Sequence, residues 1–72
     1  MRLQNRLKEI RLERQLTQEA LADAVDVTRQ TIIAIEKSKF GPSAELALRL
    51  ASALEVPVET MFWLDRDEGG RP

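Results

Sequence analysis

The sequence predicts a small all-α fold built from five short helices in one domain. Apolar residues recur at the three- and four-residue spacing of amphipathic helices along most of the chain. Side chains able to cap a helix N-terminus precede three of these stretches, at Thr17, Thr28 and Ser43. The 72 residues leave room for one domain, which buries only about 60% of its unfolded surface. Such a domain is marginally stable alone, so dimerisation would be a natural supplement.

The composition excludes several classes of function. The chain has no cysteine and no histidine, which excludes disulfides, thiolate or zinc sites and histidine-based catalysis. Paired carboxylates in an evident pocket and glycine-rich phosphate loops are also lacking, so the sequence indicates no enzyme and no cofactor. The longest apolar runs are too short to cross a bilayer, and no signal peptide is visible. We therefore expect a soluble, cytoplasmic protein with no membrane partner.

The N-terminal segment predicts one helix after a short lead. Met1 to Asn5 alternates apolar and polar residues, which suits either a short strand or a frayed end. Asn5 can cap a helix over Arg6 to Gln15, and Leu7 and Ile10 have the spacing of an inward face.

The stretch from Thr17 to Glu36 predicts two short helices joined by a tight turn. Thr17 can cap the first helix and Thr28 the second, while Asp26-Val27 interrupts the helical spacing between them. The residues expected to face the core are Ala20, Leu21, Ala24, Val25, Ile32 and Ile35. Two amphipathic helices this close share a core only by crossing steeply, as in a helix-turn-helix motif.

The start of the second helix, taken as residues 28–37, would then point into solvent. Arginine forms bidentate hydrogen bonds with guanine, and glutamine forms them with adenine. Arg29 and Gln30 are therefore the main candidate base readers. Ala34 lies one turn further on and can give only a methyl contact. The alternative for Arg29 is a solvent-facing cation. The full set of candidate base-reading residues is Thr28, Arg29, Gln30, Thr31 and Ala34.

The C-terminal half predicts two more helices. Gly41-Pro42 marks a loop, after which a helix is expected over Ala44 to Leu54. Its core stripe consists of Leu46, Ala47, Leu50, Ala51 and Leu54. Pro57 begins a short fifth helix over Val58 to Phe62. Residues 65–72 are polar and glycine-rich, which is typical of a disordered tail.

These segments together resemble the lambda-repressor-like, XRE-type helix-turn-helix regulators of bacteria and phages. The similarity rests on LTQEALADAVDVTRQTIIAIE, the preceding NRLKEIRLERQ, the loop KSKFGPS and the following ELALRLASALEVPVETMF. It covers roughly Leu3 to Leu64, and it is strongest to very short members with a DNA-binding domain and little else. The resemblance implies a five-helix DNA-binding domain over residues 1–64, with the helix-turn-helix at 17–36.

The resemblance also implies roles for individual residues. Arg11 is expected to pair with Glu36 and to lie near a DNA phosphate; the alternative is a solvated surface charge. Gln18 is expected to contact a phosphate and to brace the first residues of the recognition helix, or else to be a polar residue without a partner. For Lys37 the alternative is a solvated basic loop. The residues expected beside the DNA backbone are Arg11, Thr17, Gln18, Lys37, Ser38 and Lys39.

The aromatic residues near the C-terminus suggest a partner surface. Tryptophan is enriched in interface hot spots, and the smallest relatives pair through their C-terminal region. We therefore expect residues 1–4 and 62–65 to form a small two-stranded ribbon beside the helices. The residues expected to line a twofold contact are Leu48, Phe62, Trp63 and Leu64.

The charge distribution is compatible with a nucleic-acid partner. The net charge is −1, but residues 1–42 carry +2 and residues 43–72 carry −3, so the positive half contains the motif. The leading hypothesis is a homodimeric repressor that binds double-stranded DNA at a near-palindromic site, with half-sites about 34 Å apart. The alternative is an antitoxin-type or other interaction module that holds a second protein through its C-terminal aromatic segment.

Overall fold

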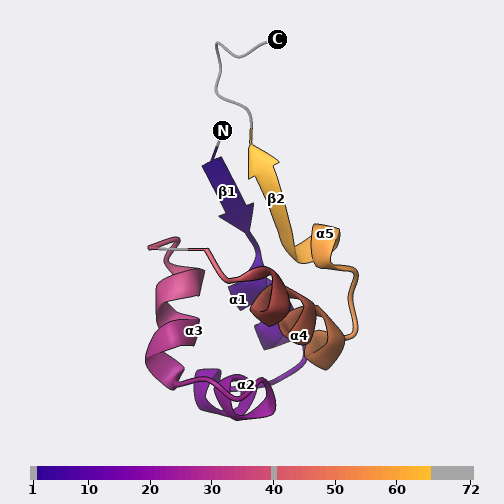
Figure 1. Cartoon of the computed structure of the whole chain (residues 1–72). Coiled ribbons are helices and arrows are strands. Elements are labelled where there is room, and N and C mark those ends of the chain that lie inside the picture. The colour runs from indigo at the N-terminus through magenta and orange to yellow at the C-terminus, as the bar shows by residue number, and fades with distance from the viewer. Residues whose placement is uncertain (1, 40, 66–72) are drawn as a thin grey trace, which may run out of the picture.

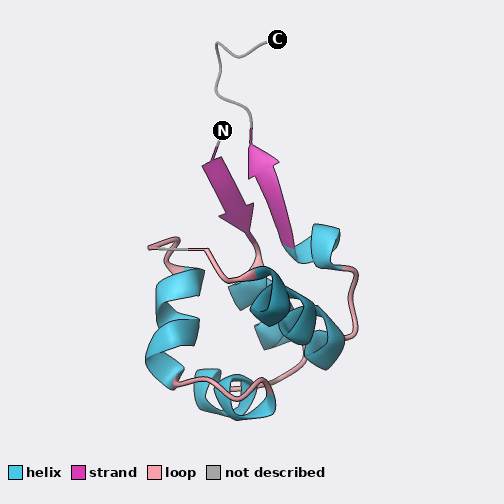
Figure 2. Ribbon diagram, viewed as in Figure 1, coloured by secondary structure: helices cyan, strands magenta, loops and turns pink. Residues whose placement is uncertain are grey.

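The computed structural model describes residues 2–39 and 41–65. Within them, five helices form a body from which a two-stranded ribbon projects (Figures 1 and 2). The elements are β1 (Arg2–Asn5), α1 (Leu7–Glu13), α2 (Gln18–Ala24), α3 (Arg29–Glu36), α4 (Ala44–Leu54), α5 (Val58–Met61) and β2 (Phe62–Asp65). The fold predicted from the sequence, five helices with a small ribbon, is confirmed. No helix in these residues is long and apolar enough to cross a membrane.

One core holds the five helices together. Its buried side chains come from α1 to α5 and the first residue of β2: Leu7, Ile10, Leu21, Ala22, Val25, Ile32, Ile35, Leu50, Ala51, Leu54, Met61 and Phe62. The prediction for α2 was wrong at two positions, because Ala20 and Ala24 are exposed and Ala22 is buried instead. A seven-residue helix buries a narrow strip, and here Leu21, Ala22 and Val25 form it.

Side-chain hydroxyls begin three of the helices. The Thr17 hydroxyl accepts from the Ala20 N–H at 3.0 Å, and that of Thr28 accepts from the Thr31 N–H at 3.3 Å. Ser43 does the same at the start of α4, at 3.1 Å from the Leu46 nitrogen. Each cap satisfies a backbone donor that the first helical turn leaves free. These starts follow the sequence prediction, since α2, α3 and α4 begin directly after the three caps.

The helix C-termini follow one pattern that the sequence analysis did not predict. Four helices end on a non-glycine residue in the left-handed region, with φ between 59° and 64°: Gln15, Asp26, Ser38 and Glu55. The next residue donates back to the carbonyl five residues earlier, as Leu16 does to Arg11 at 3.1 Å and Lys39 to Ala34 at 2.9 Å. This is the Schellman motif, which usually places glycine at that position. Helix α1 therefore ends at Glu13, two residues earlier than predicted.

The ribbon pairs the two ends of the domain. β1 and β2 are antiparallel, with Leu3 opposite Leu64 and Asn5 opposite Phe62. Its base joins the helical body, where the Arg6 N–H donates to the Met61 carbonyl at 3.0 Å. β2 has the predicted bounds, whereas β1 runs one residue further along the chain than predicted. Asp65 belongs to β2; Met1, Phe40 and the rest of the predicted tail, 66–72, lie outside the described residues.

Candidate nucleic-acid interface

The exposed end of α3 carries the predicted base-reading side chains. Thr28, Arg29 and Gln30 are exposed, and Thr31 is half-buried. Within the described residues, Arg29 and Gln30 have no ion-pair or hydrogen-bond partner through their side chains. The Thr28 hydroxyl caps the helix and lies 3.2 Å from the Thr31 hydroxyl, so its methyl group is the part left for a ligand. This end of the helix therefore offers an arginine and a glutamine free to bond base edges.

The remaining outward residues of α3 are less open. Ala34 and Ile33 are both half-buried, while Ile32 and Ile35 lie in the core. Part of the Ala34 methyl group therefore remains accessible to solvent, on the same helix as Arg29 and Gln30.

A buried ion pair fixes the opposite end of α3 to α1. The Arg11 Nε lies 2.7 Å from Glu36 Oε2, and the two side chains are only 8% and 5% exposed. A second guanidinium nitrogen, Nη2, donates to Glu36 Oε1 at 3.3 Å, and Nη1 donates to the Leu16 carbonyl at 2.8 Å. The pairing implied by the resemblance is therefore present. It joins the last turn of α3 to the scaffold with charge-assisted hydrogen bonds.

The phosphate contact expected of Arg11 stays a prediction, and the structure shows what else the guanidinium does. All three of its guanidinium nitrogens already donate within the protein, and the residue is 6% exposed. Nη1 and Nη2 each keep a second proton, but the residue is almost fully buried, so the contacts that the structure shows for Arg11 are the structural ones.

Gln18 contacts the C-terminal end of α3, whereas the sequence analysis expected it to brace the first residues of that helix. Its Nε2 donates to Glu36 Oε1 at 3.1 Å, so the first turn of α2 lies beside the last turn of α3. The amide nitrogen carries two protons, and one remains for another acceptor. Gln18 is half-buried.

The other candidate phosphate ligands lie at the surface. Lys37, Ser38 and Lys39 are exposed and follow directly after α3. Thr17 is exposed at the start of α2, although its hydroxyl is occupied as a cap. Exposed hydroxyl and ammonium groups next to a recognition helix suit contacts with a phosphate backbone.

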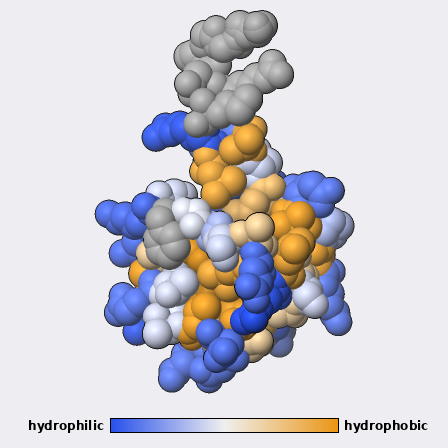
Figure 3. Space-filling view, viewed as in Figure 1, coloured by the Kyte–Doolittle hydropathy of each residue, from blue (hydrophilic) through white to orange (hydrophobic). Residues whose placement is uncertain are grey.

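The C-terminal aromatic segment divides between the core and the surface. Phe62 is 9% exposed and packs in the core, which leaves little of its surface for the partner contact predicted from the sequence. Its neighbours Trp63 and Leu64 are 38% and 62% exposed, and Leu48 on α4 is 60% exposed. Figure 3 shows hydrophobic residues, in orange, on the ribbon above the helical body, with hydrophilic residues in blue beside them.

The register of the ribbon places these side chains on two different faces. Directly opposite residues share a face, so Leu3 and Leu64 lie together on the face of Asn5 and Phe62. Trp63 lies on the other face, where the Arg6 guanidinium is 5.6 Å from its ring centre, a cation–π distance. The sequence analysis missed Leu3, which is 39% exposed. Pairing the two predicted strands residue by residue would have identified it.

Fold and site together define a class of protein: a helix-turn-helix domain whose second helix begins with exposed polar side chains. The helix-turn-helix family model matches residues 7–61, and the chain belongs to that family. It is 47% identical to the HTH-type transcriptional regulator MJ0272 of Methanocaldococcus jannaschii, covering 92% of this chain and all of the relative. It is 42% identical to the HTH-type regulator YgzD of Bacillus subtilis, over 90% and 98% of the two chains.

A solved structure supports the same assignment. The restriction-modification controller protein C.AhdI from Aeromonas hydrophila superimposes with a TM-score of 0.71 at 30% identity, covering 75% of this chain and 82% of that one. The protein is thus a transcriptional regulator with a helix-turn-helix DNA-binding domain, and not an enzyme. The partner of this family is double-stranded DNA.

Proposed function

We propose that this regulator is a cytoplasmic repressor that binds a near-palindromic operator as a homodimer. The observation that carries the proposal is the contrast between the two ends of α3. Arg29 and Gln30 are exposed and unpaired within the described residues, while Glu36 is held by a buried arginine. A rigid helix with a free polar end is suited to enter a major groove and read bases.

The contacts divide into two groups in this proposal. Thr28, Arg29, Gln30, Thr31 and Ala34 read bases, and Thr17, Gln18, Lys37, Ser38 and Lys39 bind phosphates. Phosphate contacts set the register of the protein on DNA, whereas base contacts set the sequence. The second proton of the Gln18 amide and the free N–H groups of the first turn of α2 support a phosphate there.

The dimer would form through the ribbon. Leu3 and Leu64 make an apolar pair on one face, and Leu48 offers a further exposed side chain on α4. A second copy covering them would remove apolar surface from water, which stabilises association. The twofold axis would then present two α3 helices about one helical turn, or roughly 34 Å, apart.

Selection of bound sequences from a random DNA pool tests the proposed function. The expected result is a near-palindromic consensus whose binding weakens as salt rises, because bound Lys and Arg release counterions from the phosphates. The slope of log K against log salt should be about −0.9 for each phosphate contacted. Recovery of no consensus, or affinity independent of salt, would contradict the proposal.

Replacing Leu64 with glutamate tests the dimer. A carboxylate in an apolar contact opposes association, so the variant should sediment as a monomer and lose about 100-fold or more in operator affinity, because the two half-sites no longer act together. Leu12→Glu is the matched control, since Leu12 is 54% exposed on α1, outside the proposed contact. A wild-type chain that is a monomer both in free solution and in the presence of DNA would favour the alternative. In that alternative, the ribbon binds a second protein.

A further inference from the structure

The C-terminal end of α3 lacks an apolar anchor that the other long helices have. At α1, α2 and α4 the residue after the left-handed position is Leu16, Val27 or Val56, and each packs against the core. Such a contact commonly accompanies the Schellman motif and holds the helix end in place. At α3 the equivalent residue is Lys39, which is exposed. The Arg11–Glu36 pair fixes the last turn of α3 to α1, and a further polar contact joins the end of α3 to the ribbon.

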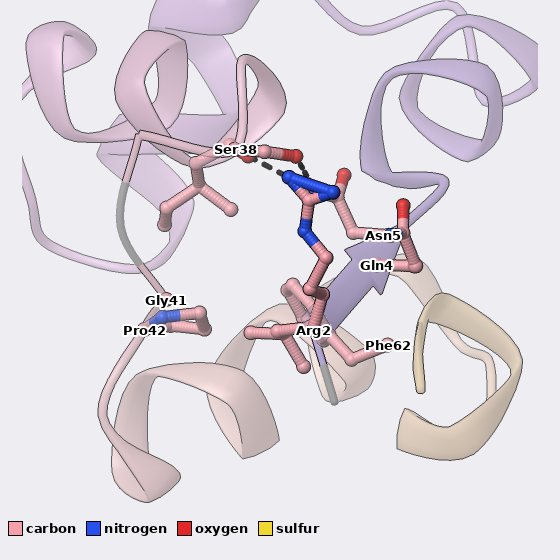
Figure 4. Close-up of a pocket in the computed structure, with 9 residues that line it drawn as sticks. Arg2, Gln4, Asn5, Ser38, Gly41, Pro42 and Phe62 are labelled. Atoms are coloured by element: carbon pink, nitrogen blue, oxygen red, sulfur yellow. Dashed lines mark hydrogen bonds between the residues drawn. The ribbon is translucent and has the colours of Figure 1, made fainter. Parts of the chain in front are cut away.

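Asn5, at the base of the ribbon, contacts that end directly. Its Nδ2 donates to the Ile35 carbonyl at 3.0 Å and lies 3.4 Å from the Ser38 hydroxyl. Its Oδ1 accepts from the Leu7 N–H at 3.0 Å, which begins α1. Figure 4 shows Asn5 next to Ser38 in the lining of a cavity, with dashed lines marking the hydrogen bonds. Within the described residues, Asn5 is the side chain that hydrogen-bonds the ribbon to α3.

The surroundings give this link little support. A cavity of about 420 Å³ lies beside it, lined by Arg2, Leu3, Gly41 and Pro42 among others. Leu3 packs closely on Gly41, because a Cβ built on Gly41 would lie 2.7 Å from Leu3 Cδ2. An apolar contact of this kind is not directional, so it constrains the orientation of the ribbon less than a hydrogen bond does. The other attachments of the ribbon, buried Phe62 and the Arg6 to Met61 hydrogen bond, lead to the core and α5. Within the described residues, the Asn5 amide therefore supplies the hydrogen bonds between the ribbon and the end of α3, while Phe62 shares the core with Ile35 of that helix.

We propose that Asn5 is a positioning residue that sets the spacing of the two DNA half-sites. The inference rests on the proposed function, because a dimer formed through the ribbon places each recognition helix at a distance and angle fixed by the ribbon. The Asn5 amide fixes that angle by holding the Ile35 carbonyl at the end of α3. Asn5 touches no base, and it acts only through the position of α3.

Two amide-to-acid variants one residue apart test the proposal. Asn5→Asp keeps the size and the oxygen that accepts from Leu7 but loses the donor to Ile35. Gln4→Glu is the matched control, since it makes the same charge change on the opposite face of β1, where no hydrogen bond to α3 is present. Asn5→Ser is a second variant, whose hydroxyl can still cap α1 but is too short to reach Ile35. Thermal unfolding would verify that each variant is folded.

The readout is affinity for the selected operator and for operators with one base pair added or removed between half-sites. The wild-type chain should prefer the original spacing. Asn5→Asp and Asn5→Ser should reduce the ratio of original to shifted affinity by about three- to tenfold, the equivalent of one hydrogen bond. Gln4→Glu should keep the wild-type ratio.

Each other outcome has a distinct meaning. An unchanged ratio in the Asn5 variants, an equal loss at every spacing, or the same reduction in Gln4→Glu would overturn the role of Asn5 and leave the proposed function standing. A wild-type chain that binds DNA without any spacing preference would overturn the dimer and this inference with it. A wild-type chain that binds no operator would overturn the proposed function itself.

Discussion

Replacing Glu36 with alanine is expected to lower the free energy of unfolding by about 3 to 5 kcal/mol, the cost of breaking a buried ion pair. The substitution leaves the Arg11 side chain, which is 8% exposed when Glu36 is present, with no carboxylate beside it. It also removes the acceptor of the Gln18 amide. A buried charge without a partner is costly because neither water nor a counter-charge compensates its lost hydration. For a domain of this size, the midpoint of thermal unfolding should fall by more than about 12 °C.

Urea unfolding followed by circular dichroism measures this loss. Glu45→Ala is the control, since it breaks the Arg49–Glu45 pair, whose atoms are 2.6 Å apart but whose side chains are 49% and 74% exposed. That exposed pair should contribute less than about 1 kcal/mol. The double variant Arg11→Met with Glu36→Leu should recover much of the stability, because apolar side chains of similar volume need no charge partner. Equal losses for Glu36→Ala and Glu45→Ala would show that burial adds nothing to the Arg11 pair.

The sequence predicts this fold well where local chemistry decides the structure. Thr17, Thr28 and Ser43 each bond a backbone N–H three residues away, so a hydroxyl before an amphipathic stretch is sufficient to place the helix start. The apolar spacing of Ile32 and Ile35 likewise fixes which face of α3 is buried, and the opposite face then carries the residues predicted to read bases. The free end of the recognition helix was predictable because it depends only on these two local features.

The features that the sequence did not reveal depend on tertiary contacts. The helix ends at Gln15, Asp26 and Glu55 carry no glycine, and the apolar residue that follows each one is recognisable only once the core is known. Phe62 and Trp63 are adjacent aromatics with opposite fates, because strand geometry turns one into the core and the other outward. The same limit applies to the Asn5 amide, whose acceptor on Ile35 lies 30 residues away.

Replacing Arg29 with alanine is expected to weaken binding to the selected operator by about 1 to 3 kcal/mol and to relax the preference at one base position. The reason is that its exposed guanidinium can bond both acceptors of one guanine edge, which no other base presents in the same pattern. Arg29→Lys is the control for charge, because lysine keeps the positive charge but loses the two-pronged geometry. It should retain affinity for unrelated DNA while losing the base preference.

Lys39→Ala separates base reading from phosphate binding. Lys39 follows α3 and is exposed, so its loss should weaken all DNA sequences alike and make the slope of log K against log salt shallower by about one. Titrations of both variants against the selected operator, a version changed at one base, and unrelated DNA distinguish the two effects. If Arg29→Ala lowered affinity equally for all three DNAs, as Lys39→Ala should, arginine 29 would be a phosphate ligand. Sequence preference would then have to come from Gln30 and the threonines beside it.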